Sequence, residues 1–530
     1  MTTFFINRIA NGSKYNYAKL LLSVFFLVAV CLPLCSLFIK LFDPNVREIF
    51  LTSQFSQALS NSIITAGLAT IIAVTIAFIT AWILCRTNIS CKNFIAGLMT
   101  VPMLIPSLAH GMGLVYLFGT NGIITNLTHI DIGLYGFTGI ILGSVIYAFP
   151  PAFLLLYDVL RYEDAAAYEA SDVLGIPKLF QIKTITFSYL KKPLISALFA
   201  SFTLFITDYG VPLLVGGKVL TLPVLMYQEA VGLLNFNTGA AIGFVLLIPA
   251  FIAFLIDLIT NTHKSTTYVT HPFSIKDNKI RDTFSTIFIV VVSIFILLPI
   301  FSFILVSFAR DYPTDISFTF DNVLRTFEMS AGTYLVNSLL LGIAVSVIGT
   351  ILAYCAAYMT ARMRGKFSML LHLMCITTLA IPGIVLGLSY IIFFGKTPLY
   401  GTFLILILVN IVHFIASPYM LAYNSLLKIN ANLENVGLTL GVRRWSIFKD
   451  VIIPQTKDTI LEMVSFFFVN CMVTISAVSF LAGVSNMPLA LLVTNFDSQH
   501  LIECAAFVSL MILVTNVLCK TVIVFLKRYH

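Results

Sequence analysis

The sequence predicts an all-α integral membrane protein with twelve transmembrane helices, arranged as two parallel six-helix repeats. Of its 530 residues, 59% are hydrophobic and only 10% are charged, whereas a soluble domain carries about 25% charged residues. Apolar stretches of about 20 residues, long enough to cross a bilayer, recur along the whole chain. The net charge of +8 does not indicate nucleic-acid binding, because the basic residues lie at the ends of the apolar stretches.

Six apolar stretches precede a polar, basic linker, and six more follow it. The first begins after several basic residues, and its length favours a retained helix over a cleaved signal peptide. We expect a first repeat over 1–260, a cytoplasmic linker over 261–282 that acts as a plain tether, and a second repeat over 283–530. The predicted spans lie near 20–41, 58–84, 94–118, 137–159, 193–215 and 239–260, and then near 283–307, 335–360, 368–394, 402–424, 458–482 and 502–526.

The two halves share short motifs at nearly constant spacing, which identifies them as copies of one unit. The offset changes only in the predicted outer loops, where a common scaffold tolerates insertions. Six spans per copy is an even number, so both copies cross the membrane in the same direction, as a parallel repeat. The matched pairs are Leu32-Pro33 with Leu298-Pro299, Asn61-Ser62 with Asn337-Ser338, Arg86 with Arg362, Ile105-Pro106 with Ile381-Pro382, Pro151 with Pro418, Gly175 with Gly441, and Pro223 with Pro488.

The distribution of Lys and Arg predicts cytoplasmic N- and C-termini. Cytoplasmic loops of membrane proteins are enriched in these residues. With the N-terminus in the cytoplasm, the outer loops hold only six of the 31 Lys and Arg residues: Lys40, Arg47, Lys218, Arg310, Arg325 and Lys396. This orientation places the loop between the fourth and fifth spans of each half in the cytoplasm.

Those two loops share a pattern of their own. Each opens a short helical run, and a glycine then ends it, as expected where the chain needs a left-handed residue. A second amphipathic run follows, so two short helices at an angle carry an apolar edge that needs a partner. The first loop, Tyr168–Lys192, contains Glu169, Ala170, Ser171, Gly175 and Ile185, and the second, Glu434–Pro454, contains Glu434, Gly437, Gly441 and Pro454.

The pattern resembles the EAA loop of ABC-type import permeases, in which E-A-A is followed by three residues, G, nine residues and I-x-L-P. We call the two stretches the first and second EAA-like loops. The alternative is an ordinary loop lying on the membrane surface. Two departures from the family pattern, Ser188 in place of proline and Asn435-Val436-Gly437 in place of E-A-A, suggest unequal ATPase contacts.

The resemblance extends over nearly the whole chain, to fused double permeases of the ferric-iron, thiamine and 2-aminoethylphosphonate import group. It implies the type I ABC importer permease fold and a bacterial inner-membrane location. It also implies two copies of a separate ATPase, which would hold ATP and Mg²⁺, and an extracytoplasmic substrate-binding protein. Glu169 and Glu434 would anchor the coupling helices. Stretches such as DYGVPLLVGG favour 2-aminoethylphosphonate or another organophosphate as substrate, then ferric iron, then thiamine.

The chain itself is not expected to be an enzyme or to bind a cofactor or metal, since no G-x-x-x-x-G-K-[ST] phosphate loop occurs. Charged groups inside spans are costly and mark candidate transport paths. Asp208 precedes the helix breakers Gly210 and Pro212, so it either lines a path or caps the next helix. The candidate path residues are Asp208, Tyr209, Thr474, Ser476, Ser479, His110 and His413, and packing is the alternative for both histidines.

Two other functions remain open from the sequence. A twelve-helix secondary transporter driven by an ion gradient is one, with Asp208 and the histidines as proton carriers. A channel or scaffold is the other. The near absence of further carboxylates in mid-span and the presence of two EAA-like loops argue against a gradient-driven carrier. We also expect short helices at Leu222-Pro223 and Met487-Pro488 on the outer rim, where a binding protein would dock.

Overall fold

The computed structural model describes residues 17–44, 46–260, 273, 275, 277–363, 366–430 and 432–528, and it is almost entirely helical. In the described residues, eight helices are long and apolar enough to cross a membrane, and two bent helix pairs raise the number to ten. The remaining two predicted spans, 94–118 and 458–482, fall on a broken helix and on a helix of 17 residues. An α-helical membrane protein is therefore confirmed, whereas the count of twelve stays a prediction.

The first half begins with a helical span from Tyr17 to Lys40. Its elements are η1 (Leu27–Cys31), α2 (Leu32–Lys40), α3 (Val46–Leu51), α4 (Ser53–Arg86), α5 (Lys92–Leu98), η2 (Val101–Leu104), α6 (Ser107–Phe118), α7 (Ile123–Thr128), α8 (Phe137–Arg161), α9 (Ala166–Val173), α10 (Lys178–Gln181), η3 (Ile182–Thr186), α11 (Phe187–Ile206), α12 (Gly210–Val215), α13 (Leu222–Tyr227), η4 (Gln228–Gly232) and α14 (Phe236–Thr260).

The second half repeats this order and adds an antiparallel hairpin in which Ala309 pairs with Phe318. Its elements are α15 (Lys279–Ser307), β1 (Ala309–Asp311), β2 (Asp315–Phe318), α16 (Asp321–Glu328), α17 (Ala331–Ala361), α18 (Lys366–Thr377), η5 (Thr378–Ala380), α19 (Gly383–Phe394), α20 (Phe403–Phe414), α21 (Ala416–Lys428), α22 (Asn432–Thr439), α23 (Arg444–Ile447), η6 (Phe448–Ile452), α24 (Ile453–Gln455), α25 (Lys457–Val473), α26 (Leu489–Ser498) and α27 (Ile502–Arg528).

The third predicted span of each half is broken at its Ile-Pro pair. Pro106 and Pro382 adopt extended ψ angles of 151° and 140° immediately before α6 and α19. Proline lacks the N–H that would continue a helix through this point. In the second half the two parts, Phe367–Ala380 and Gly383–Phe394, are bent by 110°. The matched Ile-Pro pairs thus mark a shared break.

The first span of each half packs against the other half. α2 contacts α19 of the second half, and α15 contacts α6 of the first half. The Tyr390 hydroxyl donates to the Ala29 carbonyl at 2.7 Å, and a Cβ on Gly113 would lie 2.7 Å from Pro299 Cβ. One buried core spans both halves and includes Phe26, Tyr209 and Tyr390. The halves are therefore interlocked.

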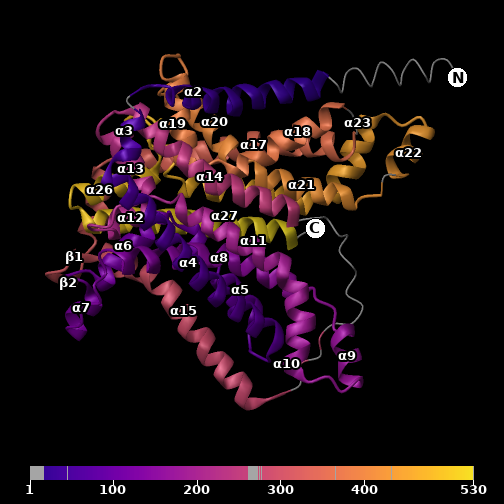
Figure 1. The fold of residues 1–530 in the computed structure, drawn as a ribbon, viewed down its shortest axis with the longest axis horizontal. Coiled ribbons are helices and arrows are strands. Elements are labelled where there is room, and N and C mark those ends of the chain that lie inside the picture. The colour runs from indigo at the N-terminus through magenta and orange to yellow at the C-terminus, as the bar shows by residue number, and fades with distance from the viewer. Residues whose placement is uncertain are drawn as a thin grey trace.

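The EAA-like loops lie at one end of this bundle. Figure 1 shows α9 and α10 at the same end as α22 and α23, with the end of α27 between them. The hairpin β1–β2 and α7 lie at the opposite end. Both loops are thus presented to the same side, as a parallel repeat requires.

Candidate functional site

Both EAA-like loops form a short helix, a glycine turn and a second short helix. Gly175 and Gly441 adopt positive φ angles of 68° and 75°. In the first loop the Ile176 N–H donates to the Ser171 carbonyl at 3.0 Å. In the second, the Val442 N–H donates to the Gly437 carbonyl at 2.9 Å. These six-to-one hydrogen bonds define the Schellman ending, so the predicted glycine caps are confirmed in both halves.

The other predicted coupling residues occupy different environments in the two loops. Glu169 and Ala170 are exposed on α9, whereas Ser171 is buried and donates to the Tyr168 carbonyl at 2.8 Å. Ile185 is half-buried in η3, and Pro454 is exposed in α24. The last two of the set are Gly437, which packs against Ile447, and Glu434, which faces Arg362.

Large apolar side chains project outward from both loops. In the first loop Val173 is 89% exposed and Leu179 is 83% exposed. In the second, Leu440 is 75% exposed and Trp445 is 68% exposed. Val173, Leu179 and Trp445 lie on the short helices α9, α10 and α23, and Leu440 directly follows α22. Each loop therefore presents an apolar surface suited to a protein partner.

A buried ion pair holds the base of the first loop. Arg86, the last residue of α4, contacts the Glu163 carboxylate, and their side chains are 12% and 3% exposed. The Tyr168 hydroxyl donates to Glu163 Oε1 at 2.8 Å and lies 2.6 Å from Thr186 Oγ1. Burial raises the pKa of the Glu163 carboxyl, and the Tyr168 hydrogen bond and Arg86 offset only part of this effect. Burial likewise raises the pKa of Tyr168 to about 12.

The second loop is held by the matching arginine with a different set of partners. Arg362 Nε lies 3.4 Å from Glu434 Oε1, and the Tyr358 hydroxyl donates to the same oxygen at 3.1 Å. The Arg362 guanidinium also donates to the carbonyls of Leu426, Ile429 and Asn430, at 3.3, 2.6 and 3.2 Å. Arg362 thus positions Glu434. In the first half the carboxylate paired with the matching arginine belongs to Glu163 and not to Glu169.

Sequence reasoning missed four residues of this site: Arg86, Arg362, Glu163 and Tyr168. The two arginines carried a signal, since they match in the two halves at one of the shared offsets. Glu163 carried none, because its partner lies 77 positions away in the chain.

Asp208 caps α12. Its carboxylate accepts from the N–H groups of Val211 at 3.1 Å and Gly210 at 3.4 Å, and the Ser107 side chain lies nearby. A carboxylate at this position satisfies N–H groups that the start of a helix leaves free. The sequence left two interpretations of Asp208 open, a group that lines a path or a cap of the next helix. Its hydrogen bonds in the structure are those of a helix cap.

The breaks in the two fifth spans meet between the halves. The side chain of Tyr209 in the first half lies close to the Ser479 side chain of the second. Tyr209 also stacks on Tyr227, whose ring faces Phe480 with 6.5 Å between centroids. Thr474 follows the end of α25 and donates to the Asn470 carbonyl at 2.5 Å. Tyr209 and Ser479 therefore close a contact across the middle of the molecule.

The same breaks show a reciprocal pairing of glycine and serine. A Cβ on Gly210 would lie 2.4 Å from Ser107 Oγ, and a Cβ on Gly383 would lie 2.4 Å from Ser476 Oγ. The third span supplies the serine in the first half and the glycine in the second. At each of the two matching contacts, one serine side chain thus packs against the glycine of the facing span.

The two histidines lie beside these breaks but in different positions. His110 is fully buried in α6, with its ring 5.7 Å from that of Tyr147. His413 in α20 is half-buried, and its Nε2 would lie 2.9 Å from a Cβ on Gly383. The structure thus brings His413 near Ser476 and leaves His110 with Tyr147, in packed surroundings.

The two predicted outer helices are held by matching clamps. The Leu222 N–H donates to Ser62 Oγ at 2.8 Å, and the Leu489 N–H donates to Ser338 Oγ at 2.6 Å. Asn61 donates to the Leu220 carbonyl and Asn337 to the carbonyls of Ser485 and Met487. The hydrogen bonds pair Leu222 with Leu489, so the predicted match of Pro223 with Pro488 was wrong by two residues.

Comparison with known proteins gives a consistent result. The family described as "Binding-protein-dependent transport system inner membrane component" matches residues 73–263 and 348–529. A ferric transport system permease protein of Haemophilus influenzae, FbpB 1, is 24% identical over 89% of this chain and 79% of its own length. The ferric transport system permease protein FbpB of Actinobacillus pleuropneumoniae is 24% identical over 89% of this chain and 73% of its own.

A solved structure of a bacterial alginate ABC transporter, in complex with a periplasmic protein bound to an alginate pentasaccharide, also aligns. The aligned chain is 16% identical with a TM-score of 0.39, covering 46% of this chain and 92% of the other.

Proposed function

The chain belongs to the family of binding-protein-dependent transport system inner membrane components, and we propose that it carries ferric iron into the cytoplasm with the help of a separate ATPase. It is a fused double permease of an ABC importer, since the family matches once in each half. As a permease component it is not itself an enzyme.

The observation that carries the proposal is the pair of EAA-like loops at one end of the molecule. Each is a pair of short helices joined by a glycine turn, and each presents exposed apolar side chains. Two such surfaces suit two copies of an ATPase, which would hold ATP and Mg²⁺. This end then lies in the cytoplasm of a bacterial cell, together with both chain termini, in agreement with the Lys and Arg distribution.

Ferric iron is the better-supported substrate. The relatives that cover most of this chain are named for ferric transport, whereas no finding supports the sequence-based preference for 2-aminoethylphosphonate. An extracytoplasmic binding protein would deliver the substrate at the end that carries β1–β2 and α7 (Figure 1).

In the proposed cycle, closure of the ATPase dimer moves the two loops, and the arginines at their bases transmit this movement to α4 and α17. The contact between Tyr209 and Ser479 would then have to open to let the substrate pass. A gradient-driven carrier is less well supported, because the Asp208 carboxylate is engaged in capping α12.

Reconstitution of the chain with candidate ATPase and binding-protein subunits tests the coupling part of the proposal. We expect Leu174→Asp combined with Leu440→Asp to abolish ATPase binding, since both side chains are 75% exposed on the loops. Leu127→Asp is the control, because Leu127 is 77% exposed on α7 at the opposite end. Glu169→Ala combined with Glu434→Ala should weaken the stimulation of ATP hydrolysis by the chain, measured in the same reconstituted system.

The proposal fails if no ATPase associates with the unmodified chain and proteoliposomes take up solute on a proton or sodium gradient. The substrate is tested separately, by uptake of radioactive ferric iron from a loaded binding protein in competition with 2-aminoethylphosphonate or thiamine. Uptake of one of those solutes without iron uptake would contradict the ferric assignment.

A further inference from the structure

The end of the linker between the halves is docked on the base of the first EAA-like loop. The Phe273 ring lies over the Arg86 guanidinium, 3.4 Å from Cζ to the ring centroid. The same ring meets Tyr168 edge to face, with 5.0 Å between centroids. Phe273 therefore contacts both Arg86 and Tyr168, the two partners of Glu163, and the expectation of a plain tether does not hold for this part of the linker.

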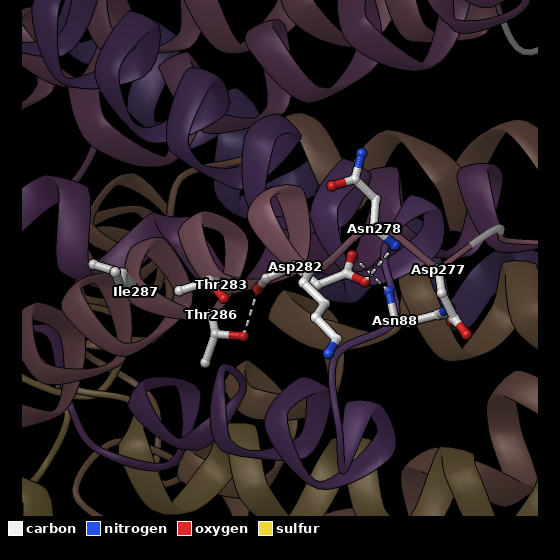
Figure 2. A pocket seen from close by; sticks show the side chains of 8 residues that line it. Asn88, Asp277, Asn278, Asp282, Thr283, Thr286 and Ile287 are labelled. Carbon is white, nitrogen blue, oxygen red and sulfur yellow. Dashed lines mark hydrogen bonds between the residues drawn. The ribbon is translucent and has the colours of Figure 1, made fainter.

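A second contact fixes the linker a few residues further along. Asn88, two residues after the end of α4, donates through its side chain to the Ile275 carbonyl at 3.3 Å and to Asp277 Oδ1 at 2.5 Å. Its backbone N–H donates to Asp282 Oδ1 at 3.2 Å. Figure 2 shows Asn88 and Asp282 facing each other at the start of α15. The linker thus enters α15 already attached to the end of α4.

The ring and the arginine form a favourable pair. A guanidinium over an aromatic ring contributes most where water is excluded. The Arg86 side chain is 12% exposed, and its Nε has no hydrogen-bond partner in the described part of the chain. Phe273 supplies an interaction at a face of the guanidinium that hydrogen bonds leave unused. Through Tyr168, which belongs to α9, the same ring also contacts the loop directly.

The second EAA-like loop is built without this feature. Arg362 is held by Glu434 and three backbone carbonyls of its own half. Within the described ranges, no aromatic ring lies over its guanidinium. The linker occurs once in the chain, so only one loop can have it as a neighbour.

We propose that Phe273 is a positioning residue through which the linker restrains the first EAA-like loop, so that α9 is held more firmly than α22. The linker would thereby make the two ATPase contacts mechanically unequal. The loop restraint is a property of this chain alone, while its effect on transport rests on the proposed function.

The restraint is tested by hydrogen exchange of the full chain in lipid nanodiscs, comparing Phe273→Ala with the unmodified protein. We expect amide exchange in α9 to become roughly three to tenfold faster, since a partly buried cation–π contact is lost. Exchange in α22 should stay unchanged. Phe273→Tyr should restore the original rate, because it keeps the ring. Phe320→Ala, which removes a 60% exposed ring elsewhere in the second half, is the matched control.

Unchanged exchange in α9, or equal acceleration in α9 and α22, would overturn the proposal. In the complex with ATPase and binding protein, Phe273→Ala should raise the number of ATP molecules hydrolysed per substrate imported, and Phe273→Tyr should reverse the change. Faster exchange with an unaltered ratio would overturn the transport part alone. If no ATPase binds the unmodified chain, the proposed function fails, yet the exchange result still decides the restraint.

Discussion

The bases of the two EAA-like loops share one arginine and differ in almost everything around it. Arg86 is paired with a carboxylate that is 3% exposed and is covered by the ring of a linker residue. Arg362 meets a carboxylate that is 19% exposed and donates to three backbone carbonyls. A duplicated scaffold has thus kept the charge that holds the loop while its partners have diverged.

The turns themselves differ in the same way. In the first loop Asp172 bonds to Lys178 and to Gln181 Nε2, each at 2.6 Å. In the second, Gly437 allows Ile447 to pack closely against α22. The first loop is therefore held mainly by polar contacts and the second by backbone carbonyls and apolar packing. The comparison suggests that the two loops will respond differently to the same kind of substitution.

Removing the carboxylate at each base should give the largest difference. Glu163→Ala leaves a buried guanidinium without its counter-ion, which costs about 3 kcal/mol or more. Glu434→Ala should cost only about 1 kcal/mol, because Arg362 keeps its carbonyl partners. The apparent melting temperature of the detergent-solubilised chain measures both. Equal losses would show that the two bases are energetically the same.

Replacing the turn glycines should give a smaller and equal effect. Gly175→Ala and Gly441→Ala each place a side chain at positive φ, which costs about 1 kcal/mol. Among the described residues, and apart from the adjacent ones in the chain, no atom lies within 4 Å of a Cβ at either position, so backbone strain accounts for the effect. Thermal stability of the two variants should agree. A larger loss of thermal stability in one variant would show that a steric contact adds to the backbone strain there.

The smallest effect is expected at the matched pair Ser171 and Gly437. Ser171→Ala should be neutral or slightly stabilising, by up to about 0.5 kcal/mol, since alanine favours helix. Gly437→Ala should give no such gain in stability, because its Cβ would lie 2.5 Å from Ile447 Cδ1. Adding Ile447→Val removes that methyl group and should recover the gain. If the double variant is no more stable than Gly437→Ala in thermal unfolding, close packing is not the reason for the glycine.

Local pattern was enough to predict the loops and much of the fold. The repeat, the apolar spans and both glycine turns depend on spacing within short stretches, and Gly175 and Gly441 adopt the positive φ that the pattern requires. The break before α6 and α19 also has a local cause in Pro106 and Pro382. The family matches agree with the resemblance drawn from the same motifs.

Contacts between distant residues could not be predicted in this way. Glu163 and Arg86 are 77 positions apart, and Tyr209 meets Ser479 across the two halves. The docking of Phe273 depends on where the linker runs after both halves have packed. The end of α25 at Val473 also depends on tertiary packing, since the apolar run continues past it. Roles of the path residues in transport therefore stay predictions.

The exchange of first spans between the halves has a consequence for synthesis of the chain. Ala29 and its partner Tyr390 are 361 positions apart. At about 5–20 residues per second, a ribosome needs roughly 20 to 70 seconds to cover that distance. During this interval the N-terminal span has left the ribosome without the surface that will receive it. Nascent chains at this stage should therefore depend on lipid or on the insertion machinery to shelter the first helix.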